Sequence, residues 1–184
     1  MKIQEELVSY HDRLPKRDPA TIDLIVLHCT ELPTLEMARE FAEKIVNPEW
    51  LTGNCGHYYI DRDGSLYRYV NDDRIANHVL GFNDASIGIE IINTGRYPNW
   101  FAKETQTMTD PYSRDQVDSL KELLRHLTRT HSGICKMARH SDLDLRTMPA
   151  TNDCSSEVRR RIDPGPMFPW EEVHKSFEDM VRFR

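Results

Sequence analysis

Residues 21–30, Thr-Ile-Asp-Leu-Ile-Val-Leu-His-Cys-Thr, constrain the fold of this chain more than any other stretch. Between Ile22 and Leu27 the side chains are aliphatic and mostly β-branched, broken only by Asp23, which is typical of a strand buried on both faces. Such a strand belongs in the centre of a sheet. It ends at His28, a residue type that binds metals or carries protons. From this stretch alone, the simpler interpretation of His28 is a polar residue that marks the strand's end.

Three helices are predicted from apolar residues at helical spacing. The first begins after Thr34, which can cap its N-terminus, and ends at Asn47-Pro48. The second follows Ser113 and spans about 18 residues, a length read from its periodic apolar stripe. The third begins near Pro169 and presents a packing face that contains Trp170. All three are interpreted as helices that pack on the core.

The remaining strands are short and rich in aromatic or β-branched residues. Residues 57–60 and 65–70 flank a polar turn that ends in glycine, which predicts a β-hairpin. Further strands are expected at 86–92 and 134–139. We expect residues 1–20 to form an irregular arm, and residues 94–112 and 141–162 to be loops. The fold class is therefore α/β, with a central mixed sheet flanked by helices in one domain over residues 21–184.

Composition excludes several classes of function. The chain has 184 residues and a net charge of −6, with basic and acidic residues interspersed, so no basic face for nucleic acid is expected. No stretch approaches the ~20 apolar residues of a membrane span, and the first residues are acidic where a secretory signal would be apolar. We therefore expect a cytoplasmic monomer that binds neither nucleic acid nor membrane. Its cysteines lack C-x-x-C spacing, so free thiols are expected.

Three residues could form a metal site together. His28 and His140 each follow a predicted strand, and Asp163 precedes a rigid Pro-Gly-Pro turn. Two imidazoles and one carboxylate are a recurrent catalytic zinc arrangement, and zinc chemistry suits the hydrolysis of an amide or ester. Glu90 also needs an explanation, because an acid within an apolar strand is costly unless it is exposed at a sheet edge, paired or beside a metal.

Five segments together resemble the type 2 N-acetylmuramoyl-L-alanine amidases, a superfamily that includes AmpD-like amidases, phage lysozyme-amidases and peptidoglycan recognition proteins. Their order along the chain is that of the family. The most specific are Ser-Ile-Gly-Ile-Glu, ending at Glu90, and Asp-Pro-Gly-Pro, beginning at Asp163. The matching segments are residues 25–30, 56–64, 83–90, 138–142 and 162–170.

The resemblance implies a Zn²⁺ site made by His28, His140 and Asp163. It implies that Glu90 is the general base, taking a proton from the attacking water and passing it to the leaving amine. The expected substrate is peptidoglycan or a muropeptide, cleaved between N-acetylmuramic acid and L-alanine. One alternative is a non-catalytic peptidoglycan-binding module, which the presence of all three ligand types disfavours. Another is a zinc hydrolase of other amides.

Some positions depart from the family pattern. Arg161 stands where many members have a lysine that stabilises the oxyanion, and an arginine fork is not interchangeable with an ammonium group. Gly56 replaces a tyrosine that some members carry, so no tyrosine role is assigned. The segment 141–162 is longer than the AmpD-like pattern and would reshape one wall of the cleft.

Three other residues receive roles by analogy with the family or by their place in the sequence. His78 and Asn83 lie in the loop before residue 86, and we assign them to substrate contact. His57 is expected to be structural, since it belongs to a hairpin strand. A cysteine is the third metal ligand in some relatives, but Asp163 is preferred here to Cys154 because its Pro-Gly-Pro context is that of the family.

Overall fold

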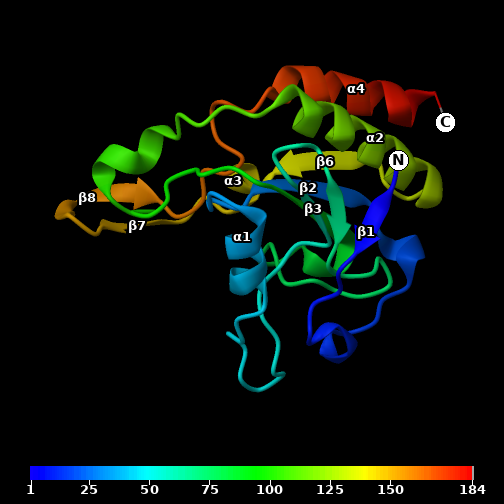
Figure 1. The fold of residues 1–184 in the computed structure, drawn as a ribbon, viewed down its shortest axis with the longest axis horizontal. Helices are drawn as coiled ribbons and strands as arrows, with labels where there is room; N and C mark the ends of the chain where they lie inside the picture. Colours follow the sequence, from blue (N-terminus) through cyan, green and yellow to red (C-terminus); the bar gives the residue numbers. More distant parts are fainter. Residues whose placement is uncertain (184) are drawn as a thin grey trace.

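The structure of the chain is a computed structural model that describes residues 1–183 (Figure 1). Its main element is a six-stranded mixed sheet in the order β1-β4-β3-β5-β2-β6. The strands are β1 (Ile3–Glu5), β2 (Leu24–Cys29), β3 (Tyr58–Ile60), β4 (Leu66–Arg68), β5 (Ser86–Ile91) and β6 (Lys136–Arg139). The helices are α1 (Leu35–Ala42), α2 (Arg114–Thr130), α3 (His140–Leu143) and α4 (Trp170–Arg182). This architecture confirms the predicted fold class.

β2 is an inner strand, as the apolar run in the sequence predicts. It pairs in parallel with β5 on one side and β6 on the other, and all six of its residues are buried. The predicted hairpin is also present, since β3 and β4 pair antiparallel. Buried strands of this kind are covered on both faces by other elements.

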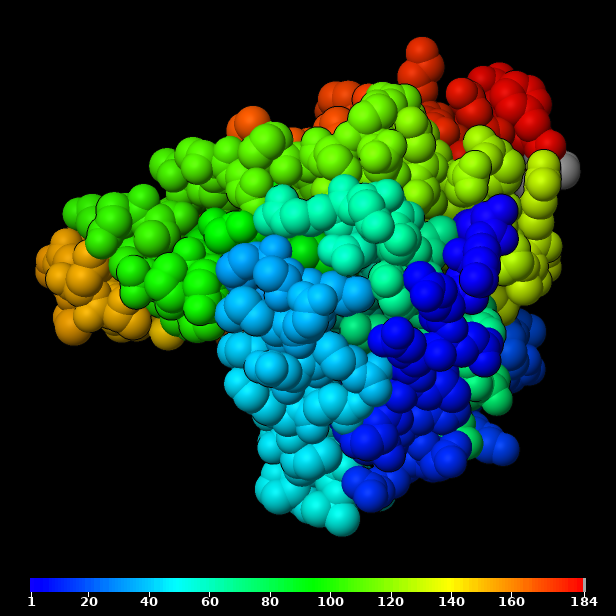
Figure 2. Space-filling view, viewed as in Figure 1, coloured from blue at the N-terminus to red at the C-terminus, as the bar shows by residue number. Residues whose placement is uncertain are grey.

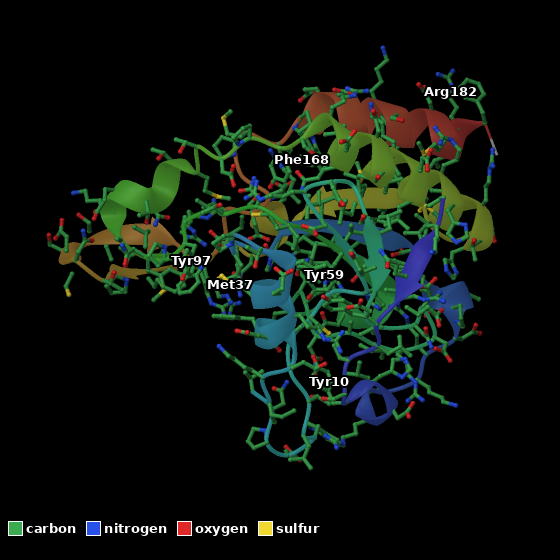
Figure 3. All side chains as sticks on the ribbon, in the orientation of Figure 1. Tyr10, Met37, Tyr59, Tyr97, Phe168 and Arg182 are labelled. Atoms are coloured by element: carbon green, nitrogen blue, oxygen red, sulfur yellow. The ribbon has the colours of Figure 1, made fainter. Side chains whose placement is uncertain are left out.

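Two apolar layers cover the faces of the sheet. One layer holds α2 and α4 against the strands and includes Phe168. The other layer includes Tyr10, Tyr59 and residues of α1. Figure 3 labels these three aromatic residues on the ribbon. Within residues 1–183, no helix is both long enough and apolar enough to cross a bilayer.

The helix caps match the sequence prediction, but one helix is shorter than expected. Ser113 Oγ accepts a hydrogen bond from the Gln116 backbone amide, and Gln116 Oε1 accepts one from the Ser113 backbone amide, which forms a capping box. Thr34 caps α1 by accepting a hydrogen bond from the Met37 amide. However, α1 ends at Ala42, and Ile45 is 45% exposed instead of packing on the core.

Two segments expected to be irregular contain regular structure. Residues 1–20 include β1, which extends the sheet by pairing in parallel with β4, and two 3-10 turns, at His11–Arg13 and Pro19–Thr21. Residues 141–162 contain most of α3 and an antiparallel hairpin, β7 (Thr147–Ala150) and β8 (Asp153–Arg159). A three-residue strand is too short to show periodicity, and the hairpin buries Ala150 and Val158 but is otherwise too polar to show a regular alternation. The proposed domain boundary at residue 21 stays a prediction.

The β7–β8 hairpin and the long loop 94–112 together form a lobe beside the main sheet (Figure 1). The loop contains a 3-10 helix, η4 (Lys103–Thr107), and a second one, η3 (Asn83–Ala85), precedes β5. The Thr151 amide donates a hydrogen bond to the Phe101 carbonyl, and Lys103 forms an ion pair with Asp153. We call residues 94–112 and 147–159 the lobe.

Leu120→Ala should destabilise the fold strongly, because Leu120 is fully buried between α2 and the sheet. Loss of the buried side chain should reduce the free energy of unfolding by about 2–5 kcal/mol. Glu122→Ala, at an exposed position of the same helix, should change it by less than about 0.5 kcal/mol. Urea denaturation followed by circular dichroism measures both. Equal effects would contradict the assignment of this face to the core.

Candidate metal centre and cleft

Three parallel strands deliver the central residues to one edge of the sheet. His28 is the register partner of Glu90 on β5, and Leu27 is the partner of Arg139 on β6, so His140 follows directly. The carboxyl ends of neighbouring parallel strands meet at the same edge, where open α/β sheets bind ligands. The register therefore places two imidazoles and one carboxyl group side by side.

His28, His140 and Asp163 form a compact buried cluster. His28 Nδ1 lies 2.9 Å from His140 Nδ1 and 3.2 Å from Asp163 Oδ2, and the last two atoms are 3.0 Å apart. Among the described residues, these three form a group whose ligand atoms lie within 4.8 Å of one another and could hold a metal ion. Asp163 lies in the turn before α4, and its backbone carbonyl accepts a hydrogen bond from the Ser141 amide.

The electrostatic state of the cluster suits a cation. Burial, followed by the nearby His140, lowers the pKa of His28 to about 4, so its imidazole is neutral near pH 7. Burial alone would raise the pKa of Asp163, but His140 and His28 hold it well below its usual range. Neutral imidazole and ionised carboxylate are the forms that bind metal ions.

Two further observations support the fit to a metal ion. Asp163 Oδ1 is buried and has no hydrogen-bond partner within the described chain. A buried carboxylate oxygen without a partner is costly, and a cation would satisfy it. The three ligand atoms are also spaced much like those around one tetrahedral zinc, which are about 3.3 Å apart when the bonds are about 2.0–2.1 Å.

Glu90 lies beside the cluster on an inner strand. The presence of an acid in this apolar strand is therefore not explained by exposure at a sheet edge. The Glu90 side chain is half-buried. Burial, with a smaller contribution from the Asp163 charge, raises the pKa of Glu90 to about 8, and the Arg161 charge partly opposes this shift. Such a pKa lets one carboxyl group both accept and release a proton near neutral pH.

His78 lies against His28. His28 Nε2 is 3.0 Å from His78 Nδ1, and His78 Nε2 is 3.2 Å from Ser86 Oγ, which donates to the Phe82 carbonyl. This chain of contacts fixes which nitrogen of His28 faces Asp163. In the sequence, Gly88 marks the close approach of the His78 ring, because a Cβ added at Gly88 would lie 2.5 Å from His78 Nδ1.

The other sequence-predicted residues occupy varied positions. Asn83 lines the same cavity as His78, but its Oδ1 accepts hydrogen bonds from the His78 and Val79 amides within their own loop. Substrate contact by His78 and Asn83 stays a prediction. His57 is fully buried, with Nδ1 accepting from the Gly88 amide and Nε2 3.1 Å from the Arg74 carbonyl oxygen. These contacts fit a structural role.

Neither cysteine considered as a ligand belongs to the cluster. Cys29 is buried, and burial together with the nearby Asp163 raises the pKa of its thiol well above the usual value. Cys154 is exposed on the β7–β8 hairpin. Neither thiol is among the residues whose ligand atoms come together to form a possible metal site.

A cavity of about 760 Å³ opens over the cluster. The four residues His28, Glu90, His140 and Asp163 lie at its base, and Arg161 lines it as well. Its lining also includes Phe41 of α1 and Trp100 of the lobe, whose ring centroids lie 6.1 Å apart. Figure 2 shows the surface recessed where the lobe stands away from the α1 segment. A cavity of this size is typical of small-molecule and peptide sites.

The family model for N-acetylmuramoyl-L-alanine amidase matches residues 18–166 of this chain. The chain belongs to that family. Its activity is accordingly that of an N-acetylmuramoyl-L-alanine amidase. The match spans the strand that ends in His28 and extends through the Asp163 turn.

The chain is also similar to one curated relative in sequence and to several solved structures in fold. The 1,6-anhydro-N-acetylmuramyl-L-alanine amidase AmpD of Haemophilus influenzae is 25% identical, over 91% of this chain and 88% of the relative. The endolysin amidase LysCS of Clostridium intestinale shares the fold, with a TM-score of 0.65 and 24% identity over 95% of this chain and 93% of the other. AmiD from E. coli, solved with anhydro-N-acetylmuramic acid-L-Ala-D-γ-Glu-L-Lys, has a TM-score of 0.62 and 20% identity over 85% of this chain and 57% of the other.

Glu90→Gln should stabilise the metal-free protein in a pH-dependent way. The pKa of Glu90 is about 8 when folded against an ordinary value of 4.5, so the folded state binds its proton more tightly than the unfolded state. Its contribution to the free energy of unfolding therefore falls as pH rises from about 4.5 to 8 and is then constant. The stabilisation by Glu90→Gln should grow over that window, as thermal melts of chelator-treated protein would measure. A pH-independent difference would contradict the raised pKa.

Proposed function

We propose that this amidase is zinc-dependent and cleaves the bond between the lactyl group of N-acetylmuramic acid and the L-alanine of the stem peptide. The observation that carries the proposal is the cluster of His28, His140 and Asp163, with its unpartnered buried carboxylate oxygen. When bound, a zinc ion supplies Lewis-acid polarisation of the scissile carbonyl and lowers the pKa of its water towards ~7.

The remaining catalytic roles fall to side chains of this chain. Glu90 accepts a proton from the attacking water and returns it to the leaving amine of L-alanine. Arg161, which lines the cavity, carries positive charge towards the developing oxyanion. His78 holds His28 in the orientation that presents Nδ1 to the site. Each of these roles uses a side chain already placed at the cavity base or wall.

Peptidoglycan or a soluble muropeptide is the proposed substrate. The AmpD relative is named for a 1,6-anhydro-N-acetylmuramyl-L-alanine substrate, and AmiD was solved with a fragment of the same kind. The cavity walls offer aromatic side chains from Phe41 and Trp100 and positive charge from Lys44 and Arg160. Aromatic faces suit the sugar, and cations suit the carboxylates of a stem peptide.

Variants of Glu90 and His28 separate metal binding from turnover. Glu90→Ala should keep the zinc, because Glu90 lies outside the ligand cluster, and should lose about 10²–10⁴-fold in kcat. His28→Ala should lose zinc and activity together. His126→Ala, at an exposed histidine of α2, is the matched control and should lose neither. Elemental analysis and turnover measure these effects; a metal-free wild type or a fully active Glu90→Ala variant would contradict the proposal.

Mass spectrometry of the products tests the bond that is cleaved. From an anhydro-muropeptide, we expect a free peptide beginning with L-alanine and a sugar that keeps its lactyl carboxylate. Intact sacculus in a parallel reaction shows whether polymeric wall is also cleaved. Cleavage within the stem peptide would favour a hydrolase of other amides, and binding without cleavage would favour a peptidoglycan-binding module.

A further inference from the structure

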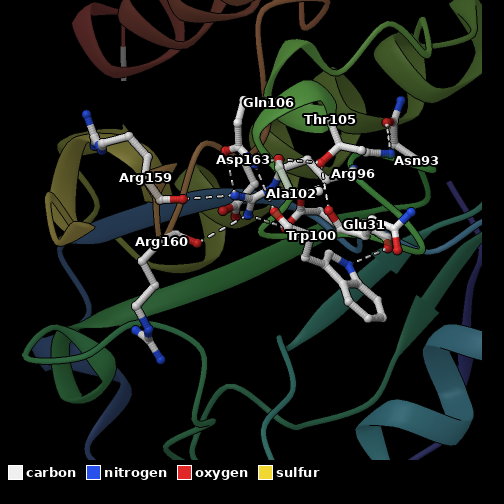
Figure 4. A network of polar contacts seen from close by, with 12 residues as sticks. Glu31, Asn93, Arg96, Trp100, Ala102, Thr105, Gln106, Arg159, Arg160 and Asp163 are labelled. Carbon is white, nitrogen blue, oxygen red and sulfur yellow. Dashed lines mark hydrogen bonds and ion pairs between the residues drawn. The ribbon is translucent and has the colours of Figure 1, made fainter. Parts of the chain in front are cut away.

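Arg96 is a buried cation away from the metal cluster, with every side-chain donor in use. It is 1% exposed and belongs to the loop that follows β5. Nε and Nη2 donate to the Glu31 carboxylate at 2.5 and 2.7 Å, and Nη1 donates to Gln106 Oε1 at 3.2 Å. Nη1 and Nη2 also donate to the carbonyls of Arg159 and Arg160, at 2.9 and 3.2 Å (Figure 4). A guanidinium has five N–H donors, and all are satisfied here.

Glu31 anchors this cation to the strand that carries His28. Glu31 lies three residues beyond His28, is 4% exposed and adopts a φ of 50°. Its carbonyl accepts a hydrogen bond from Trp100 Nε1 at 3.1 Å. Gly95 permits the close approach, since an added Cβ would lie 2.7 Å from Glu31 Cγ. The end of β2 is thereby joined to the lobe through buried polar contacts.

The two carbonyls that Arg96 holds immediately precede Arg161. On the other side of Arg161, the Asp163 carbonyl is held by the Ser141 amide. The Arg161 side chain itself has a buried Nε without a hydrogen-bond partner in the described residues. Its place in the cavity therefore depends on where the backbone puts it.

We propose that Arg96, paired with Glu31, is a positioning residue that sets the place of Arg161 in the cleft by holding the carbonyls of residues 159 and 160. This rests on the oxyanion role proposed for Arg161. A buried ion pair is seldom more stabilising than apolar residues of similar volume, so the directional hydrogen bonds are what this pair supplies. Small misplacements of groups that bind the transition state can cost about 10²-fold in rate.

A double-mutant cycle tests the coupling. Arg96→Lys keeps the charge beside Glu31 but cannot reach both carbonyls, so kcat should fall about 10–100-fold with KM within about twofold and zinc content unchanged. In the Arg161→Ala background, the same substitution should change kcat by less than about twofold, because the residue that it positions is gone. An equal loss in both backgrounds would overturn the proposal and leave Arg96 as a general stabiliser of the lobe.

Arg62→Lys is the matched control. Arg62 also joins the lobe to the body, through Asp110 and the Thr94 hydroxyl, but it does not contact residues 159–161. The Arg62 side chain is 40% exposed, so its substitution should cost less stability in thermal melts than Arg96→Lys, while its effect on kcat should be the same in both backgrounds. Coupling of Arg62→Lys to Arg161 as strong as that of Arg96→Lys would also overturn the proposal.

Hydrogen–deuterium exchange gives a readout independent of turnover. Arg96→Lys should accelerate exchange in a peptide covering residues 158–163, where the Arg160 amide donates to the Arg146 carbonyl, more than Arg62→Lys does. Unchanged exchange in this peptide would overturn the positioning role. An inactive wild type would contradict the proposed function, and this comparison would still decide whether Arg96 holds the segment. If Arg96→Lys does not fold, Glu31→Gln, which removes the carboxylate that pairs with the same guanidinium, takes its place in both measurements.

Discussion

The parallel pairing of β2 with β5 and β6 determines where every group of the candidate centre lies. Backbone hydrogen bonds in this part of the sheet align His28 with Glu90 and bring His140 one position beyond β6. Because β2 and β5 are inner strands with mostly buried residues, His28 and Glu90 are held by the central part of the sheet, while His140 follows the edge strand β6. Asp163 is the one proposed ligand that does not belong to or follow one of these three strands. Its turn lies next to His140, because the Asp163 carbonyl accepts a hydrogen bond from the Ser141 amide.

Burial of the ionisable groups in the candidate metal centre opposes folding. Glu90 is pushed towards its protonated form, and Asp163 keeps an oxygen without a hydrogen bond. Both features destabilise the metal-free fold, while apolar packing on the two faces of the sheet offsets them. A cation between the imidazoles would compensate Asp163 directly. The raised pKa of Glu90 and the unpartnered Asp163 oxygen lower the stability of the metal-free fold, and the same two features suit proton transfer and cation binding.

The sequence predicts the central strand and the helix starts better than the segments that line the cleft. His28 follows a continuous apolar run, and the caps Thr34 and Ser113 are local signals, so these features could be found by pattern alone. Residue type suggested His28, His140 and Asp163 as one possible metal site, and the resemblance to the family implied the same set, because residues so far apart have no informative spacing. The structure places these three side chains together; that they bind zinc is a proposal.

The parts that sequence reasoning missed are those held by long-range polar contacts. The β7–β8 hairpin has little apolar alternation, so residues 141–162 resembled a loop. Glu31 and Arg96 look like surface charges until the fold brings them together in the interior. The contact of His78 with His28 was also hidden, although Gly88 marks the close approach of its ring. These contacts depend on tertiary structure that no local pattern encodes.

The central claim is that His28, His140 and Asp163 bind zinc. X-ray absorption spectroscopy of the zinc-loaded protein measures the ligand atoms directly. We expect only nitrogen and oxygen neighbours, at about 2.0–2.2 Å, with scattering from two imidazole rings. A sulfur neighbour at about 2.3 Å, or fewer than two imidazoles, would contradict it.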